Sequence, residues 1–277
     1  MRLGVFAKTF PGDAPGPVLD AVRAAGFAGT QYNMACSGLN AVPDVVPPAT
    51  AAAVGRAAAG AGVAVEAVSA TYNMIHPDPA VRRRGLRGLD AIAAAAGAMG
   101  TGLLTLCTGT RDPDDQWRYH PGNAAPDAWR DLLASFGDAL RVAEAHDVTL
   151  GVEPEPANVV DSAARARRLI DELGSPRVRI VLDPANLSEA EPAGCQRTIV
   201  EEAVEVLGDR IALAHAKDRT ADGRVAAPGR GAIDFPHFVS CLRRVGFDGP
   251  LVAHGFSADE APSVARFLAG VVGEGGA

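Results

Sequence analysis

Eight short apolar runs alternate with segments of helical periodicity along the whole chain. The runs cover residues 3–7, 29–34, 63–70, 103–107, 148–153, 178–183, 211–216 and 250–254. Strands that alternate with helices in this way predict a parallel sheet joined by crossover helices. The runs are almost continuously apolar, which is typical of parallel strands buried on both faces.

Eight such units without a break in composition favour a closed barrel over an open doubly wound sheet. The first run is not followed by a GxGxxG motif, so a dinucleotide-binding sheet lacks its fingerprint. The length of 277 residues is ordinary for one (β/α)8 barrel. We therefore expect an α/β fold, a (β/α)8 TIM barrel, as a single domain over residues 1–277.

Composition and charge limit the partners. The chain has 26 Lys and Arg against 33 Asp and Glu, a net charge of −7, whereas phosphate-backbone binding requires a basic face. Its apolar runs are shorter than the ~18 residues that span a bilayer, and the first residues enter a strand without a leader pattern. The four cysteines are far apart and form no CxxC pair, which is typical of reduced thiols. We expect a cytoplasmic protein that binds neither nucleic acid nor membrane.

Four successive strands end in side chains that bind metals. Glu153 closes the fifth run in GVEPEP, Asp183 the sixth in VLDPAN, His215 the seventh in AHAKD and His254 the eighth in GPLVAHG. Neighbouring parallel strands lie ~4.8 Å apart, so the inward-facing ends converge. Two carboxylates and two imidazoles suit one divalent cation, with Mn, Zn, Co and Mg all compatible. A polar rim without a metal is the alternative interpretation.

Further residues of the predicted strand-end face are candidates for substrate binding. They are His76 after the third run, Trp117 in the long loop 108–123, Lys217 in AHAKD and Arg230 in a glycine-flanked loop. The long loop is a candidate lid, because long loops at this face often close over substrates. Three of these candidates have a structural alternative: a loop cap for His76, an oligomer contact for the loop that contains Trp117, and an ion pair with Asp218 for Lys217.

In this order, the motifs GVEPEP, VLDPANL, AHAKD, GRGAIDF and GPLVAHG resemble the sugar phosphate isomerase/epimerase superfamily, the xylose isomerase-like barrels. The resemblance covers essentially the whole chain. It implies one divalent metal held by Glu, Asp, His and Glu at the ends of strands five to eight. Glu153, Asp183 and His215 match the first three places, and His254 stands where a glutamate is usual. Dimers and tetramers are common in the family, so a homo-oligomer is compatible with the resemblance.

The departure at His254 bears on the reaction. In the ketose 3-epimerases of this superfamily, two metal-bound glutamates exchange protons on opposite faces of the substrate. Here Glu153 remains, and His254 would have to act as the opposite acid or base, which disfavours two-base epimerisation. Asn186 stands where those epimerases carry a substrate-contacting histidine. The DNA-repair member, endonuclease IV, is disfavoured because its extra strand-end histidines are missing here.

The resemblance therefore implies a metal-dependent isomerase or epimerase acting on a sugar, keto-sugar or inositol-type substrate. Its catalytic candidates are Glu153, His254 and Lys217, and its substrate-binding candidates are His76, Trp117, Asn186, Lys217 and Arg230. One-base isomerisation and β-elimination both need one carboxylate beside a polarised carbonyl, so a dehydratase or lyase is an alternative. A barrel that has lost turnover and only binds a ligand or partner is another.

Overall fold

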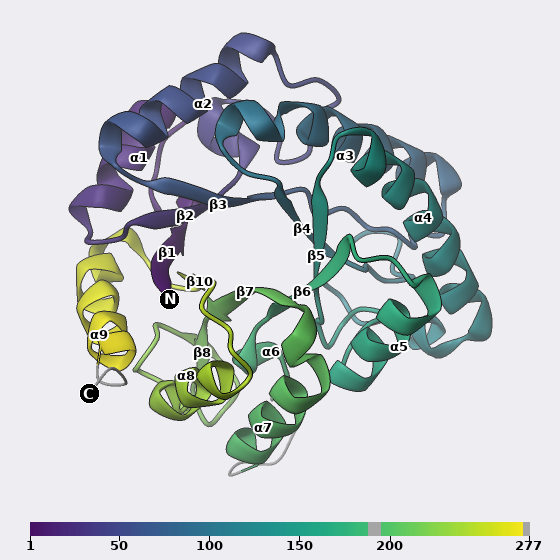
Figure 1. Cartoon of the computed structure of the whole chain (residues 1–277). Helices are drawn as coiled ribbons and strands as arrows, with labels where there is room; N and C mark the ends of the chain where they lie inside the picture. The colour runs from purple at the N-terminus through teal and green to yellow at the C-terminus, as the bar shows by residue number, and fades with distance from the viewer. Residues whose placement is uncertain (188–194, 274–277) are drawn as a thin grey trace.

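The computed structural model describes residues 1–187 and 195–273, and within them eight parallel strands close into a barrel (Figure 1). The expected (β/α)8 fold is confirmed. The strands are β1 (Arg2–Phe6), β2 (Gly29–Tyr32), β3 (Ala64–Ser69), β4 (Leu103–Cys107), β5 (Thr149–Glu153), β6 (Val178–Leu182), β7 (Ile211–Ala216) and β10 (Pro250–Ala253). β10 returns to pair with β1, so the barrel has no open edge.

Helices surround the barrel (Figure 1). They are α1 (Pro15–Ala24), α2 (Pro48–Ala61), α3 (Pro79–Met99), α4 (Pro126–Ala145), α5 (Ala163–Leu173), α6 (Pro184–Leu187), α7 (Gln196–Leu207), α8 (Phe235–Arg244) and α9 (Ala261–Gly273). A short two-stranded ribbon, β8 (Asp218–Arg219) and β9 (Val225–Ala226), follows β7 and was not expected. Among the described residues, none of the helices combines the length and the apolar character that a membrane span requires.

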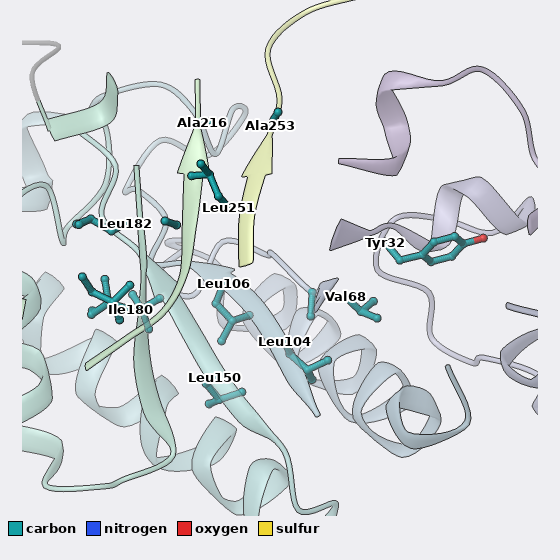
Figure 2. Packing of buried hydrophobic residues seen from close by; sticks show 14 of the residues in the cluster. Tyr32, Val68, Leu104, Leu106, Leu150, Ile180, Leu182, Ala216, Leu251 and Ala253 are labelled. Carbon is teal, nitrogen blue, oxygen red and sulfur yellow. The ribbon is translucent and has the colours of Figure 1, made fainter. Parts of the chain in front are cut away.

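Side chains on the outer face of the strands form the main core. Leu104, Leu150, Ile180, Leu182 and Leu251 are each 0% exposed, and Figure 2 shows such residues packed along the strands. Burying an aliphatic side chain of this size contributes about 1.5–3 kcal/mol. This layer fixes the strands against the helices and so holds the strand ends in place.

A smaller apolar layer fills the barrel interior and sets the direction of the functional side chains. Ala67, Val181, Leu213 and Val252 form one buried cluster there. Because side chains alternate along a strand, the residue two places beyond each member faces the same side. Asp183, His215 and His254 follow Val181, Leu213 and Val252 by two places, so they lie on the inner face, above this layer.

Candidate metal centre and active site

Four strand ends bring Glu153, Asp183, His215 and His254 together, each offering a ligand atom within 4.8 Å of the others. His215 Nδ1 lies 3.0 Å from Glu153 Oε1 and 3.9 Å from Asp183 Oδ2. His254 Nε2 lies 3.2 Å from the same Asp183 oxygen. The first three residues are buried, and the His254 side chain is 21% exposed.

The donor set fits a divalent cation. Oxygen and nitrogen ligands about 2.1 Å from a tetrahedral ion are separated from each other by roughly 3.4 Å, close to the spacings of the four side chains. His215 gives a second reason, because its Nε2 lies 2.8 Å from Gln31 Oε1 and its Nδ1 faces Glu153 Oε1. Both ring nitrogens face acceptors, an arrangement that requires either a doubly protonated ring or a cation between Nδ1 and the carboxylate.

Gln31 orients His215 from the side away from the carboxylates. Its Nε2 donates to Thr105 Oγ1 at 3.1 Å, which leaves Oε1 as the acceptor for the His215 Nε2–H. Second partners of this kind fix the tautomer and orientation of metal-ligating histidines. Gln31 lies on the second strand and was not among the predicted site residues.

Lys217 and Asn186 complete the polar cluster. Lys217 Nζ lies 3.2 Å from Asp183 Oδ2 and donates to Asn186 Oδ1, while Asn186 Nδ2 donates to Glu153 Oε1 at 2.9 Å. The ion-pair alternative named Asp218, but Asp218 instead accepts from the backbone of Gly229, Gly231 and Ile233. Lys217 is therefore available to the site.

Charge pairing keeps the two carboxylates ionised. Burial would raise the pKa of Asp183, but Lys217, His254 and His215 outweigh it and hold the pKa well below its usual range. Burial is likewise outweighed at Glu153, where His215 lowers the pKa. Burial alone would lower the pKa of Lys217, but Asp183 and the nearby glutamates raise it to about 12, so the lysine stays a cation. The pKa of His254 is lowered by burial and by His215, which keeps the ring neutral as a ligand must be.

Glu155 is a half-buried acid beside Glu153 that was not among the predicted site residues. Burial and the neighbouring charge of Glu153 raise its pKa to about 8, so it holds a proton at neutral pH. It groups with Glu153 and the buried thiol of Cys107, whose Sγ lies 4.0 Å from Glu153 Oε2. The sequence placed Glu155 beyond the strand end, and no residue pattern indicated that the chain folds back there.

Three predicted substrate-binding residues lie outside the cluster. His76 Nε2 contacts Pro113 O at 2.9 Å and its Nδ1 accepts from Asp78 N, so the ring joins two loops. Trp117 is 52% exposed in the long loop after β4. Arg230 is exposed near Glu260, whose pKa it helps to lower. Their roles in substrate binding stay predictions.

A cavity of about 520 Å³ opens beside the cluster rather than over it. His76, Asn73, Arg84, Asp112 and Thr71 are among the residues that line it. Thr71 lines this cavity, and its hydroxyl donates to Thr105 O of β4 at 3.3 Å.

The family model for the xylose isomerase-like TIM barrel matches residues 19–270, so this chain belongs to that family. A search of curated proteins finds no matching sequence.

Solved structures with the same fold have low sequence identity to this chain. An L-ribulose 3-epimerase superposes with a TM-score of 0.79 at 19% identity, covering 99% of this chain and 95% of its own. A 3-keto-D-glucoside 4-epimerase from E. coli gives 0.76 at 19% identity, with 97% and 98% covered. A D-psicose 3-epimerase from Clostridium cellulolyticum H10, solved with D-tagatose, gives 0.76 at 15% identity, with 98% and 99% covered.

Proposed function

We propose that this protein is a divalent-metal-dependent isomerase or epimerase of a sugar, keto-sugar or inositol-type substrate. The observation that carries the proposal is the convergence of Glu153, Asp183, His215 and His254 within 4.8 Å at the ends of successive barrel strands. Active sites of this fold lie at that face. Three structural neighbours are named as sugar epimerases, which supports the same substrate class here.

The metal would be held by Glu153, Asp183, His215 and His254, and when bound it supplies a Lewis acid that polarises substrate oxygens. Glu153 is the base that removes a proton from carbon. Its Oε1 is already engaged by Asn186 and faces His215, whereas among the described residues its Oε2 has only the Cys107 thiol, at 4.0 Å. Oε2 is therefore the oxygen that accepts the proton.

Lys217 and Asn186 position the oxygens of the substrate. Lys217 is 8% exposed, and its ammonium lies between Asp183 and Asn186 with a fixed positive charge. A buried cation stabilises negative charge that develops on a substrate oxygen during proton removal. Asn186 shares its amide between the base and the lysine, so it keeps their separation fixed.

The test is hydrogen exchange at carbon. The protein, loaded with Mn²⁺, is incubated in D₂O with a panel of ketopentoses, ketohexoses and 3-keto-glucosides, and each sugar is analysed by NMR and mass spectrometry. We expect deuterium next to the carbonyl of at least one sugar, together with an isomer or epimer. A product lighter by one water identifies the dehydratase alternative, whereas metal binding without exchange on any sugar supports the barrel that only binds a ligand.

His254 decides between one-base and two-base chemistry. His254→Glu is expected to retain the metal and to increase epimerisation relative to isomerisation, because a second carboxylate then stands at the eighth strand end. The matched variant His254→Gln removes the ligand without adding a base. His254→Gln should weaken metal binding by at least ~10–100-fold, which is the usual effect of losing a residue that only hydrogen-bonds to a metal ligand. Calorimetric metal titration and product ratios measure both, and full metal affinity in His254→Gln would contradict a ligand role.

A further inference from the structure

A second group of metal-binding side chains lies on the outside of the barrel, between α7 and α8, which run side by side (Figure 1). His237 and Cys241 are four residues apart on α8 and so share one face of the helix. Glu201 of α7 faces them, and the three residues offer ligand atoms within 4.8 Å of one another. None of the three belongs to the site at the strand ends.

We propose that Glu201, His237 and Cys241 form a second metal site, one that takes a zinc-type divalent ion. His237 Nε2 lies 3.1 Å from Glu201 Oε1 and 3.5 Å from Cys241 Sγ. Around a tetrahedral zinc, the corresponding nitrogen–oxygen and nitrogen–sulfur separations are roughly 3.4 and 3.6 Å. The two separations from His237 Nε2 therefore need to change by only a few tenths of an ångström for the ring to share an ion with either partner. Thiolate with imidazole favours zinc over magnesium or calcium.

The three ligand residues differ in exposure, and a cavity lies beside them. Cys241 is 0% exposed, and the side chains of His237 and Glu201 are 12% and 46% exposed. A cavity of about 340 Å³ is lined by Glu201, Glu205, Cys241 and Arg244, so open space lies directly beside the three ligand residues. Glu205 lies one helical turn beyond Glu201 and lines the same cavity.

Two arginines contact the ligand residues of the site. Burial raises the pKa of the Cys241 thiol, and Arg244, whose Nη2 donates to Cys241 Sγ at 3.3 Å, acts in the opposite direction and favours the thiolate. Arg197 Nη2 lies 3.3 Å from His237 Nδ1, while its Nε lies 3.4 Å from Asp234 Oδ2. On metal binding the thiol releases its proton, and the imidazole proton passes from Nε2 to Nδ1. Arg197 then loses its hydrogen bond to His237 Nδ1 and retains its ion pair with Asp234. One proton is released for each ion bound.

Cobalt(II) titration of the metal-free full-length protein tests the site, because thiolate-bound cobalt absorbs strongly in the near ultraviolet. We expect a charge-transfer band whose saturated intensity corresponds to one thiolate-bound cobalt per chain in the native protein. The band should disappear in Cys241→Ser and should require at least tenfold more cobalt in His237→Gln. Zinc should abolish the band by displacing cobalt. The absence of a band in the native protein would overturn the proposal.

Two variants separate this site from the one in the barrel. Asp183→Asn removes a barrel ligand and should leave the band intact. Cys107→Ser removes the thiol beside Glu153 and should likewise leave the band intact. A band that survives Cys241→Ser, or that is lost in Cys107→Ser, overturns the assignment to α7 and α8. Circular dichroism of the metal-free variants establishes that each is folded, and His237→Gln provides the test if Cys241→Ser does not fold.

Discussion

Replacing Glu153 by glutamine is expected to lower the rate of hydrogen exchange at the substrate carbon by ~10²–10⁴-fold, the usual effect of removing a general base. Glutamine keeps Oε1 as an acceptor for Asn186, whose Nδ2 donates to it at 2.9 Å in the native protein. The group that replaces Oε2 is an amide NH₂, which cannot take a proton. The loss should therefore fall on the chemical step, in kcat as well as in kcat/KM.

The exchange assay must separate the base from the metal ligand, because Glu153 is proposed to be both. Metal content is measured in each variant, and rates are compared at saturating Mn²⁺. Glu66→Gln is the matched control, since Glu66 is a strand glutamate that pairs with Arg2 at 2.7 Å and lines a cavity together with the first residues of other strands. Native exchange in a metal-loaded Glu153→Gln protein would exclude Glu153 as the base.

Periodicity was sufficient to predict the barrel and the four strand ends. A run with period two fixes which residues face inward, so Val181 and Asp183, or Leu213 and His215, had to share the interior once the barrel closed. Helix limits were nearly as clear where local chemistry marks them. Asp78 caps α3 and Gly100 ends it in the left-handed region at φ 93°.

Residues whose role depends on loop paths or irregular pairing could not be predicted in this way. Gln31 reaches His215 next to a register shift between β2 and β3, which no residue pattern reveals. Arg111, expected in a lid, instead donates to Ile75 O and pairs with Asp127 and Asp131, because its long side chain can reach α4. Glu155 enters the site through the turn after β5, where Glu155 N bonds Val160 O.

Asp183→Asn is expected to have the largest effect on stability, about 3–5 kcal/mol in the metal-free protein, because it removes one partner of a buried ion pair. Asp183 is 0% and Lys217 9% exposed in their side chains, with 3.2 Å between Nζ and Oδ2. The introduced amide keeps an oxygen for Ala185 N, which donates to Asp183 Oδ1 at 2.9 Å in the native protein, so the start of α6 should persist. What is lost is the negative charge opposite Lys217, and urea unfolding monitored by circular dichroism measures the cost.

The double variant Asp183→Asn with Lys217→Met distinguishes an unpaired buried charge from general damage. If the cost arises from a lysine left without its partner, removing the lysine should recover much of the stability, since replacing both partners of a buried pair is often nearly neutral. Asp171→Asn, at a solvent-exposed pair with Arg167, should cost less than about 1 kcal/mol. Additive losses in the double variant would contradict the pairing argument.

The same variants test metal binding at the strand ends of the barrel, and the test needs no substrate. An ion that binds only the folded protein raises its stability by RT ln(1 + [M]/Kd), so Mn²⁺ should raise the unfolding midpoint of the native protein. Lys217→Met should keep this response, because it removes the cation that competes for Asp183 Oδ2 at 3.2 Å. Asp183→Asn and the double variant both lack the Asp183 carboxylate, so both should lose the response to Mn²⁺. An equal Mn²⁺ response with and without the Asp183 carboxylate would mean that the ion binds elsewhere, and the ligand set at the strand ends would have to be abandoned.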